Sequence, residues 1–342
     1  MDAAQEDNRC VPQDFVAVDM GTTNTRVWAV RAGRAIAQSR AGVGIRDSAR
    51  DGSSERLRAA LKELMAEVCE RARAVEPDFT PVLMAAAGMI TSALGLCEVP
   101  HLEAPVGKSG LARGLKSFRF ETVCGDLPVF LVPGVRCGEP PKGPSQIGQC
   151  DVMRGEETLC LGLIELGLAT VPSVVLNLGS HWKAIGLDSG GRIAWSVTSM
   201  SGELIHCTQT QTVLAGSVPH ERPEVIDWTW CRAGMGEQRR SGLARALFCV
   251  RLLELNGRGT AAERLSFLVG CFIASDLDGL RKVLISDGSV LLVGGGAVGG
   301  AWRQALELEG ITVSELDETF LEPALISGLC SVLTASGHLT KA

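Results

Sequence analysis

The chain has 342 residues, of which 46% are apolar, 40 are glycine and none is tyrosine, and its formal net charge at pH 7 is -6. This length suffices for two packed domains, and the apolar content excludes an intrinsically disordered chain. Because affinity for DNA and RNA comes mainly from clustered Lys and Arg, the acidic balance argues against a nucleic-acid partner.

The N-terminal residues, the cysteines and the apolar runs together predict the cellular compartment. Residues 1–14 are polar and lack an apolar leader, so we expect a loose tail rather than a targeting signal. Twelve widely spaced cysteines without a Cys-x-x-Cys pair predict reduced thiols and a cytoplasmic protein. The apolar runs at 82–90 and 290–298 are shorter than the ~20 residues that span a bilayer, which predicts no membrane segment.

The first half of the chain alternates apolar runs with helical patterns. An apolar run at 15–18 is closed by the polar loop Asp19–Asn24, and two further strands follow around Gly33. Leucines at helical spacing predict an amphipathic helix over Ser54–Ala74. The remaining predictions are strands at Pro81–Ala87 and Asp126–Val132, a loop at Pro133–Gly148 and a helix at Arg154–Leu168.

The second half repeats the start of the first. At an offset of 158 residues, Val174–Ser180 lies over Val16–Thr22, and Gly191 lies over Gly33. Matching chemistry with a glycine turn at the same distance favours an internal duplication. The rest of this half predicts helices at Arg239–Leu255, Thr260–Leu280, Trp302–Glu309 and Glu322–Ala335, with strands at Ser289–Val293 and Ile311–Ser314.

This order of elements predicts an α/β protein with two related lobes. We expect a tail at 1–14, a first lobe at 15–173, a second lobe at 174–325, and a closing helix and tail at 326–342.

Two glycine-bearing loops resemble known phosphate-binding motifs, and we considered each of them. Gly294–Gly299 matches the G-x-G-x-x-G pattern, with Glu315 or Asp317 at the distance expected for a ribose-binding acid, which alone would indicate a dehydrogenase. Roughly forty residues follow it, too few for the rest of such a domain, and a glycine corner without a ligand would look the same. Gly107-Lys108-Ser109 lacks the leading glycine of a Walker A loop.

The loops after Asp19 and Asn177 are more informative because they form a pair. In the first, a strand-end carboxylate followed by glycine and hydroxyl residues supplies a partner for Mg²⁺-bound water and donors for a polyphosphate. Two such hairpins would clasp one nucleotide, and the glycines at 294–296 would pack against its base.

These motifs resemble those of the actin/hexokinase-type ATPase superfamily and, within it, the 2-dehydro-3-deoxygalactonokinase family. The order and spacing hold over roughly residues 15–330, and Met153–Thr158 is the most specific string. The resembling segments are Val18–Trp28, Ala87–Ser92, Asp151–Thr158, Gly179–Lys183 and Thr198–Leu204.

The resemblance implies a two-lobe actin-like fold, a duplicated ribonuclease H-like architecture, that binds ATP and Mg²⁺. Asp19 would order Mg²⁺ through water, and Gly294, Gly295 and Gly296 would contact the adenosine. The residues implied for the phosphates are Gly21, Thr22, Thr23 and Asn24 in the first hairpin, and Gly179, Ser180, His181 and Lys183 in the second.

The implied reaction is phosphorylation of 2-dehydro-3-deoxy-D-galactonate at its 6-hydroxyl. Arg26, Gly88, Met89, Ile90 and Arg154 would contact this substrate, and Arg154 is also a candidate for the transferring phosphoryl group.

A kinase of this kind needs a base for the acceptor hydroxyl, and three acids are candidates. We expect Asp151 to serve, with Glu156 next and Glu157 third, although one of them can simply stabilise a helix N-terminus.

Two departures weaken the substrate assignment more than the phosphate assignment. The second loop reads Leu178-Gly179-Ser180-His181 where the family usually has Pro-Gly-Thr-His, and Gly95-Leu96 and Ala104–Val106 replace other family residues. A kinase of the same fold acting on another small sugar acid or polyol stays open, as does a nucleotide-binding regulatory protein without turnover. The oligomeric state is also open, with a homodimer among the alternatives.

Overall fold

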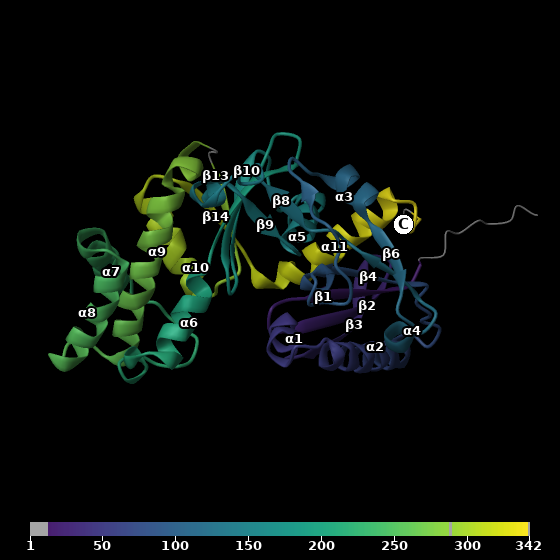
Figure 1. Cartoon of the computed structure of the whole chain (residues 1–342), viewed down its shortest axis with the longest axis horizontal. Helices are drawn as coiled ribbons and strands as arrows, with labels where there is room; N and C mark the ends of the chain where they lie inside the picture. The colour runs from purple at the N-terminus through teal and green to yellow at the C-terminus, as the bar shows by residue number, and fades with distance from the viewer. Residues whose placement is uncertain (1–12, 287–288, 341–342) are drawn as a thin grey trace, which may run out of the picture. The chain divides into compact units, whose positions relative to one another are not determined.

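A computed structural model describes residues 13–286 and 289–340, apart from the side chains of residues 282, 285 and 286 (Figure 1). The chain divides into two compact units. Unit 1 comprises the residues up to 168 and those from 322 onward, and unit 2 comprises 169–321. The expected lobe of 15–173 therefore ends five residues earlier here, and the C-terminal helix belongs to unit 1. Residues 1–12 of the expected tail lie outside the described residues.

Unit 1 is built on a six-stranded sheet of order β3-β2-β1-β4-β7-β6 and a small sheet of order β5-β8-β9. β1 runs parallel to β4 and β4 to β7, whereas β1, β2 and β3 form an antiparallel meander. The strands are β1 (Phe15–Met20), β2 (Thr25–Arg31), β3 (Arg34–Ala41), β4 (Leu83–Gly88), β5 (Leu102–Glu103), β6 (Lys116–Arg119), β7 (Pro128–Leu131), β8 (Val135–Cys137) and β9 (Asp151–Met153). The helices are α1 (Ile45–Asp51), α2 (Glu55–Val75), the 3₁₀ turn η1 (Met89–Thr91), α3 (Lys108–Gly114), α4 (Glu121–Cys124), the 3₁₀ turn η2 (Pro144–Gln149), α5 (Glu156–Glu165) and α11 (Leu321–Ala335).

The central strands β1, β4 and β7 of the six-stranded sheet are covered on both faces, which explains why they are almost entirely apolar. Alternate residues such as Val16 and Val18 pack with Leu57 and Leu61 of α2 in one core. The intervening residues face the other way, where the indole Nε1 of Trp28 donates to Glu322 Oε2 of α11 at 2.5 Å.

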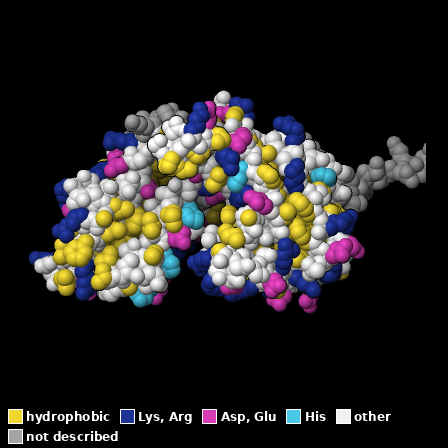
Figure 2. All heavy atoms as spheres, viewed as in Figure 1, with side chains coloured by type: hydrophobic (Ala, Val, Ile, Leu, Met, Phe, Trp, Pro, Cys, Tyr) yellow, Lys and Arg dark blue, Asp and Glu magenta, His cyan; other side chains and the backbone are white. Residues whose placement is uncertain are grey.

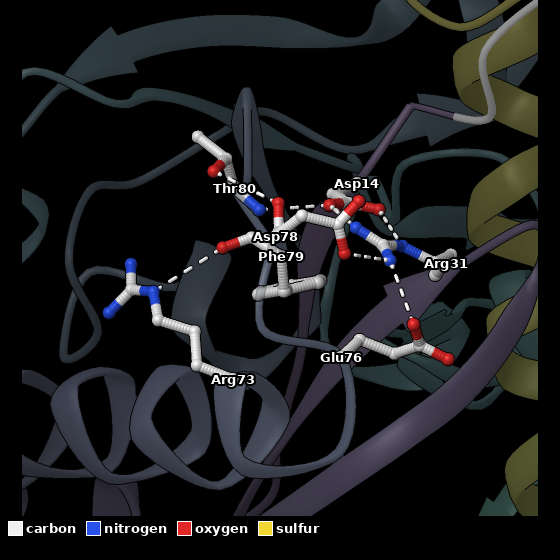
Figure 3. A network of polar contacts seen from close by, with 7 residues as sticks. All are labelled: Asp14, Arg31, Arg73, Glu76, Asp78, Phe79 and Thr80. Carbon is white, nitrogen blue, oxygen red and sulfur yellow. Dashed lines mark hydrogen bonds and ion pairs between the residues drawn. The ribbon is translucent and has the colours of Figure 1, made fainter.

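The prediction of a loose tail over residues 1–14 was wrong for Asp14, which is buried in a network of hydrogen bonds. Its carboxylate is 6% exposed and accepts two hydrogen bonds from Arg31, from Nε at 2.8 Å and from Nη2 at 2.7 Å (Figure 3). Arg31 also pairs with Glu76 and Asp78, and the backbone N–H of Thr80 donates to Asp14 Oδ2. This network fixes the amino end of β1, the end opposite Asp19.

Two glycines bring α5 and α11 into close contact. A Cβ on Gly162 would lie 1.6 Å from the carbonyl oxygen of Ala324, and one on Gly328 would lie 2.0 Å from that of Thr158. Any larger residue at either position would force the helices apart. The first turn of α5, which carries two of the candidate acids, therefore rests on a tightly packed helix crossing.

Unit 2 has a five-stranded sheet of order β12-β11-β10-β13-β14 that repeats the pattern of unit 1. Its first three strands are antiparallel, and β10, β13 and β14 are parallel. The strands are β10 (Ser173–Leu178), β11 (Trp182–Leu187), β12 (Ile193–Ser199), β13 (Ser289–Val293) and β14 (Thr312–Leu316). The helices are α6 (Ser201–Gln211), η3 (Val213–Gly216), α7 (Trp228–Ser241), α8 (Leu243–Leu255), α9 (Ala261–Ser286), α10 (Ala297–Leu308) and η4 (Glu318–Phe320).

Three element predictions were wrong in detail. The helix expected over Arg239–Leu255 is two helices, because Gly242 adopts φ +79° between them. The loop expected at Pro133–Gly148 contains β8, and α10 begins five residues before its expected start at Trp302. Among the described residues, no helix combines the length and apolar character needed to cross a membrane.

Candidate functional site

The first hairpin joins β1 to β2 through Gly21–Asn24. Asp19 and Arg26 lie opposite each other in the ladder, and Arg26 Nη2 contacts Asp19 Oδ2 at 2.6 Å. The first N–H groups of α1, from Ile45 and Arg46, donate to the carbonyls of Gly21 and Thr22. These bonds hold the loop in one conformation, while Thr22 and Thr23 stay partly exposed and Asn24 is exposed. The loop thus presents hydroxyl and amide groups beside a carboxylate.

The end of β4 lies against Asp19. Parallel register places Gly88 opposite Met20, and a Cβ on Gly88 would lie 2.5 Å from the Met20 carbonyl oxygen and 3.1 Å from Asp19 Oδ1. The φ of Gly88 is +88°, so both its conformation and its surroundings require glycine.

The residues after Gly88 divide between the site and the core. Met89 is partly exposed, whereas Ile90 is fully buried and packs in the core beneath α2. Of the two, only Met89 is exposed enough for its side chain to meet a ligand directly.

The start of α5 is the third segment at this point. A Cβ on Gly155 would lie 3.2 Å from the Cα of Gly88 and 3.9 Å from Asp19 Oδ1. The structure therefore brings together three segments that the sequence analysis singled out: the first hairpin, the loop at Gly88 and the string at 151–158.

The three candidate acids occupy different surroundings. Glu156 is the first residue of α5 and is partly exposed. Glu157 is fully buried, and both of its carboxylate oxygens accept from the backbone N–H of Gly155, at 2.9 and 2.8 Å. Burial, and then the charge of Glu156, raise the pKa of Glu157 to about 7. Asp151 lies on β9, opposite Cys137.

Arg154 reaches back to the loop after Gly88. Its Nη1 donates to Thr91 Oγ1 at 2.7 Å, and its Nη2 lies 3.4 Å from His101 Nδ1. Burial lowers the pKa of this guanidinium, and the charges of Glu157 and Glu98 oppose that shift.

The second hairpin, Gly179–His181, joins β10 to β11 in unit 2. The N-terminus of α6 supports it: Glu203 N–H donates to the Ser180 carbonyl at 2.7 Å, and His181 Nε2 lies 3.2 Å from Glu203 Oε2. Lys183 lies opposite Asn177 in the ladder, as Arg26 lies opposite Asp19, but Lys183 is only 5% exposed.

The glycine run at 294–296 follows β13, whose parallel pairing with β10 places it at the same sheet edge as the second hairpin. The three φ values are +73°, +90° and +52°, and a Cβ on Gly295 would lie 2.9 Å from the Cβ of Leu178. Of the two acids considered for a dinucleotide ribose, Glu315 faces Arg303 at 3.6 Å, and Asp317 accepts from Thr319.

Asp276 was missed by the sequence analysis. It lies in α9 and accepts from Ser199 Oγ at 2.5 Å and from Ser201 Oγ at 3.0 Å. Burial raises its pKa, and these two bonds partly offset the shift. The carboxylate thus holds the start of α6, which supports the second hairpin. A lone acid within the apolar run Leu268–Leu277 was the available signal.

A family model described as 2-keto-3-deoxy-galactonokinase matches residues 19–332. A curated protein of Rhizobium meliloti (strain 1021), described as "Probable 2-dehydro-3-deoxygalactonokinase", is 27% identical over 325 residues, which cover 94% of this chain and 97% of the relative.

Solved structures show the fold. A crystal structure assigned as a 2-dehydro-3-deoxygalactonokinase of Sinorhizobium meliloti aligns with a TM-score of 0.73 at 24% identity, covering 96% of this chain and 98% of that one. The activator of the 2-hydroxyisocaproyl-CoA dehydratase from Clostridium difficile, solved with bound ADPNP, aligns at 0.51 with 11% identity over 95% and 96% of the two chains. The expected actin-like α/β fold is confirmed.

Glu157 predicts a pH dependence of stability. In the unfolded chain its carboxyl loses the proton near pH 4.5, whereas in the folded chain it keeps the proton until about pH 7. The folded state holds the extra proton in this interval, so stability falls as pH rises from 4.5 to 7 and then levels, by about 3 kcal/mol in total.

Chemical denaturation of the wild-type chain and of Glu157→Gln between pH 4.5 and 8 measures this contribution. As the pH rises, the free energy of unfolding of the wild type should fall relative to that of Glu157→Gln, by about 3 kcal/mol in total. A difference independent of pH would show that Glu157 ionises normally in the folded state.

We expect the loss of the Asp276 carboxylate to destabilise the start of α6, which supports the second hairpin. Asp276→Ala removes two hydrogen bonds to a buried carboxylate and should lower the free energy of unfolding by about 2–3 kcal/mol. Asp276→Asn keeps an acceptor and should lose less.

Asp278→Ala is the matched control, because Asp278 lies two residues further along α9 and makes an exposed pair with Arg239. It should cost less than about 1 kcal/mol. Equal losses for Asp276→Ala and Asp278→Ala in thermal or chemical unfolding would contradict the role of Asp276.

Proposed function

The chain belongs to the 2-keto-3-deoxy-galactonokinase family, and on this basis we propose that it transfers the γ-phosphoryl group of ATP to the 6-hydroxyl of 2-dehydro-3-deoxy-D-galactonate. Membership of this family makes the chain a sugar-acid kinase of carbohydrate metabolism, acting in galactonate catabolism.

The observation that carries the proposal is the convergence of three segments at Asp19. A Cβ on Gly88 would lie 3.1 Å from Asp19 Oδ1, and Gly155 packs against Gly88, where a Cβ would lie 3.2 Å from the Gly88 Cα and 3.9 Å from Asp19 Oδ1. This brings a donor-rich hairpin, the loop leading to Thr91 and the acid-bearing start of α5 to one point. A kinase requires phosphate, acceptor and base in such proximity.

The residues at Asp19 fit a magnesium ion held mainly by water and nucleotide phosphates. Among the described residues there is no group of three or more His, Cys, Asp or Glu that could enclose a metal. A single carboxylate beside hydroxyl groups is the donor set that nucleotide-bound Mg²⁺ uses. When bound, the ion would neutralise charge on the transferring phosphoryl group.

The chain's own residues would then divide the remaining work. The hydroxyls and amides of Thr22, Thr23 and Asn24, and those of Gly179–His181 in unit 2, would bind phosphate oxygens. The glycines at 294–296 would allow the adenosine to approach the backbone, and Arg154 would bind the anionic acceptor.

We assign the base to Glu156 rather than to Asp151, which the sequence analysis had ranked first. Glu156 directly follows Gly155, which lies against Gly88 and Asp19, and its side chain is partly exposed, whereas that of Glu157 is fully buried. Its carboxylate would take the proton of the acceptor hydroxyl during transfer and hold that oxygen in line with the phosphoryl group.

The partners we propose are small molecules, namely ATP and the sugar acid, in the cytoplasm. No disulfide links the eleven cysteines in the described part of the chain, as a reducing compartment favours. On the face shown in Figure 2, Lys and Arg side chains are scattered and form no continuous band of the kind that binds nucleic acid.

Coupled measurement of ADP release tests the function. ATP with 2-dehydro-3-deoxy-D-galactonate should give sustained release, and ATP alone should give slow hydrolysis. Release that is faster with another sugar acid or polyol would reassign the substrate. Binding of ATP without release for any acceptor would identify a nucleotide-binding regulatory protein instead.

Paired variants test the base. Glu156→Gln should lower kcat about 100-fold or more, because it removes proton transfer, while KM for ATP changes little. Asp151→Asn, the control, should keep kcat within a few-fold of the wild type. The opposite result would return the role to Asp151.

A further inference from the structure

The guanidinium of Arg154 is held by two acceptors that carry no negative charge. Thr91 Oγ1 accepts from Nη1 at 2.7 Å, and His101 Nδ1 lies 3.4 Å from Nη2. Because arginine has no acceptor atom, His101 Nδ1 acts as the acceptor in this contact. Among the described residues, no carboxylate lies within ion-pair distance of this guanidinium in the structure.

The arginines of the β1–β2 ladder are different. Arg26 pairs with Asp19, and Arg31 pairs with Asp14, Glu76 and Asp78. Arg154 is partly buried, and burial of a cation costs free energy unless an anion compensates it. The charges of Glu157 and Glu98 act on Arg154 without forming an ion pair with it, and its hydrogen-bond partners are a hydroxyl and an imidazole nitrogen. A guanidinium held in this way is arranged to receive an anion from solution.

The position of this cation is fixed relative to Asp19. The Thr91 hydroxyl is fully buried and donates to the Gly88 carbonyl at 3.0 Å, so Thr91 links Arg154 to the residue that lies against Asp19. Gly134 supports the other side: a Cβ there would lie 2.7 Å from Arg154 Cγ and 2.9 Å from His101 Cδ2.

We propose that Thr91 and His101 hold Arg154 as the receptor for the carboxylate of the acceptor sugar acid, and so determine the preference for acids over neutral sugars. Two of the five N–H groups of the guanidinium bond to Thr91 and His101, and the remaining three suffice for a bidentate carboxylate. This inference rests on the proposed function, since it concerns how that acceptor is recognised.

Pairs of variants separate this role from a purely structural one. Thr91→Val and His101→Leu remove the acceptors, whereas Thr91→Ser keeps the hydroxyl and His101→Asn keeps an acceptor near Nδ1. Each is assayed with 2-dehydro-3-deoxy-D-galactonate and with its neutral analogue, in which a hydroxymethyl group replaces the carboxylate.

We expect Thr91→Val and His101→Leu to lower kcat/KM for the acid about 10-fold, as loss of a charge-assisted hydrogen bond does. They should leave kcat/KM for the neutral analogue and KM for ATP within about 2-fold, and Thr91→Ser and His101→Asn should restore the preference for the acid.

Three results would overturn the inference. Equal losses for the acid and the analogue would mean that Thr91 and His101 act on folding alone, which thermal unfolding of each variant would confirm. An unchanged preference in both disruptive variants would place the carboxylate elsewhere. A wild-type enzyme inactive on the acid but active on another acceptor would remove this inference together with the proposed function, whereas the first two results leave that function intact.

Discussion

In each unit the first strand of the antiparallel meander also pairs in parallel with the next strand of the sheet. These parallel pairs are β1 with β4 and β10 with β13. Parallel pairing brings the carboxyl ends of both strands to one edge, where backbone groups are no longer used by the sheet. The end of β1, at Asp19 and Met20, meets Gly88 there, and the end of β10, at Leu178, meets the glycine run at 294–296. Residues distant in sequence thus become one candidate site in unit 1 and another in unit 2.

The duplicated architecture carries different chemistry in its two copies. The first hairpin pairs a partly exposed aspartate with an exposed arginine across the ladder, at Asp19 and Arg26. At the equivalent ladder position of the second hairpin, an amide faces a buried lysine, Asn177 opposite Lys183. A carboxylate suits a hydrated cation, whereas an amide and a lysine suit phosphate oxygens. Under the proposed function, the first hairpin would serve the metal and each hairpin would bind phosphate oxygens.

Much of this arrangement could be predicted from the sequence, because strand-end Asp and Gly residues and the 158-residue repeat are local signals. The paired hairpins and the glycine run were found in this way. Contacts between distant residues could not be found: Asp276 bonds to serines 75 and 77 residues away, and Thr91 bonds to Arg154 across 63 residues. Ile90 shows the converse error, since proximity to Gly88 in sequence does not reveal that its side chain turns into the core.

We propose that the site at Asp19 directs one phosphoryl group to the terminal hydroxyl of a sugar acid. Phosphorus NMR of the product formed from ATP and 2-dehydro-3-deoxy-D-galactonate is the most direct test. We expect ADP and a single phosphomonoester coupled to the two protons of the terminal carbon. Inorganic phosphate alone, or a phosphomonoester on a secondary carbon, would contradict it.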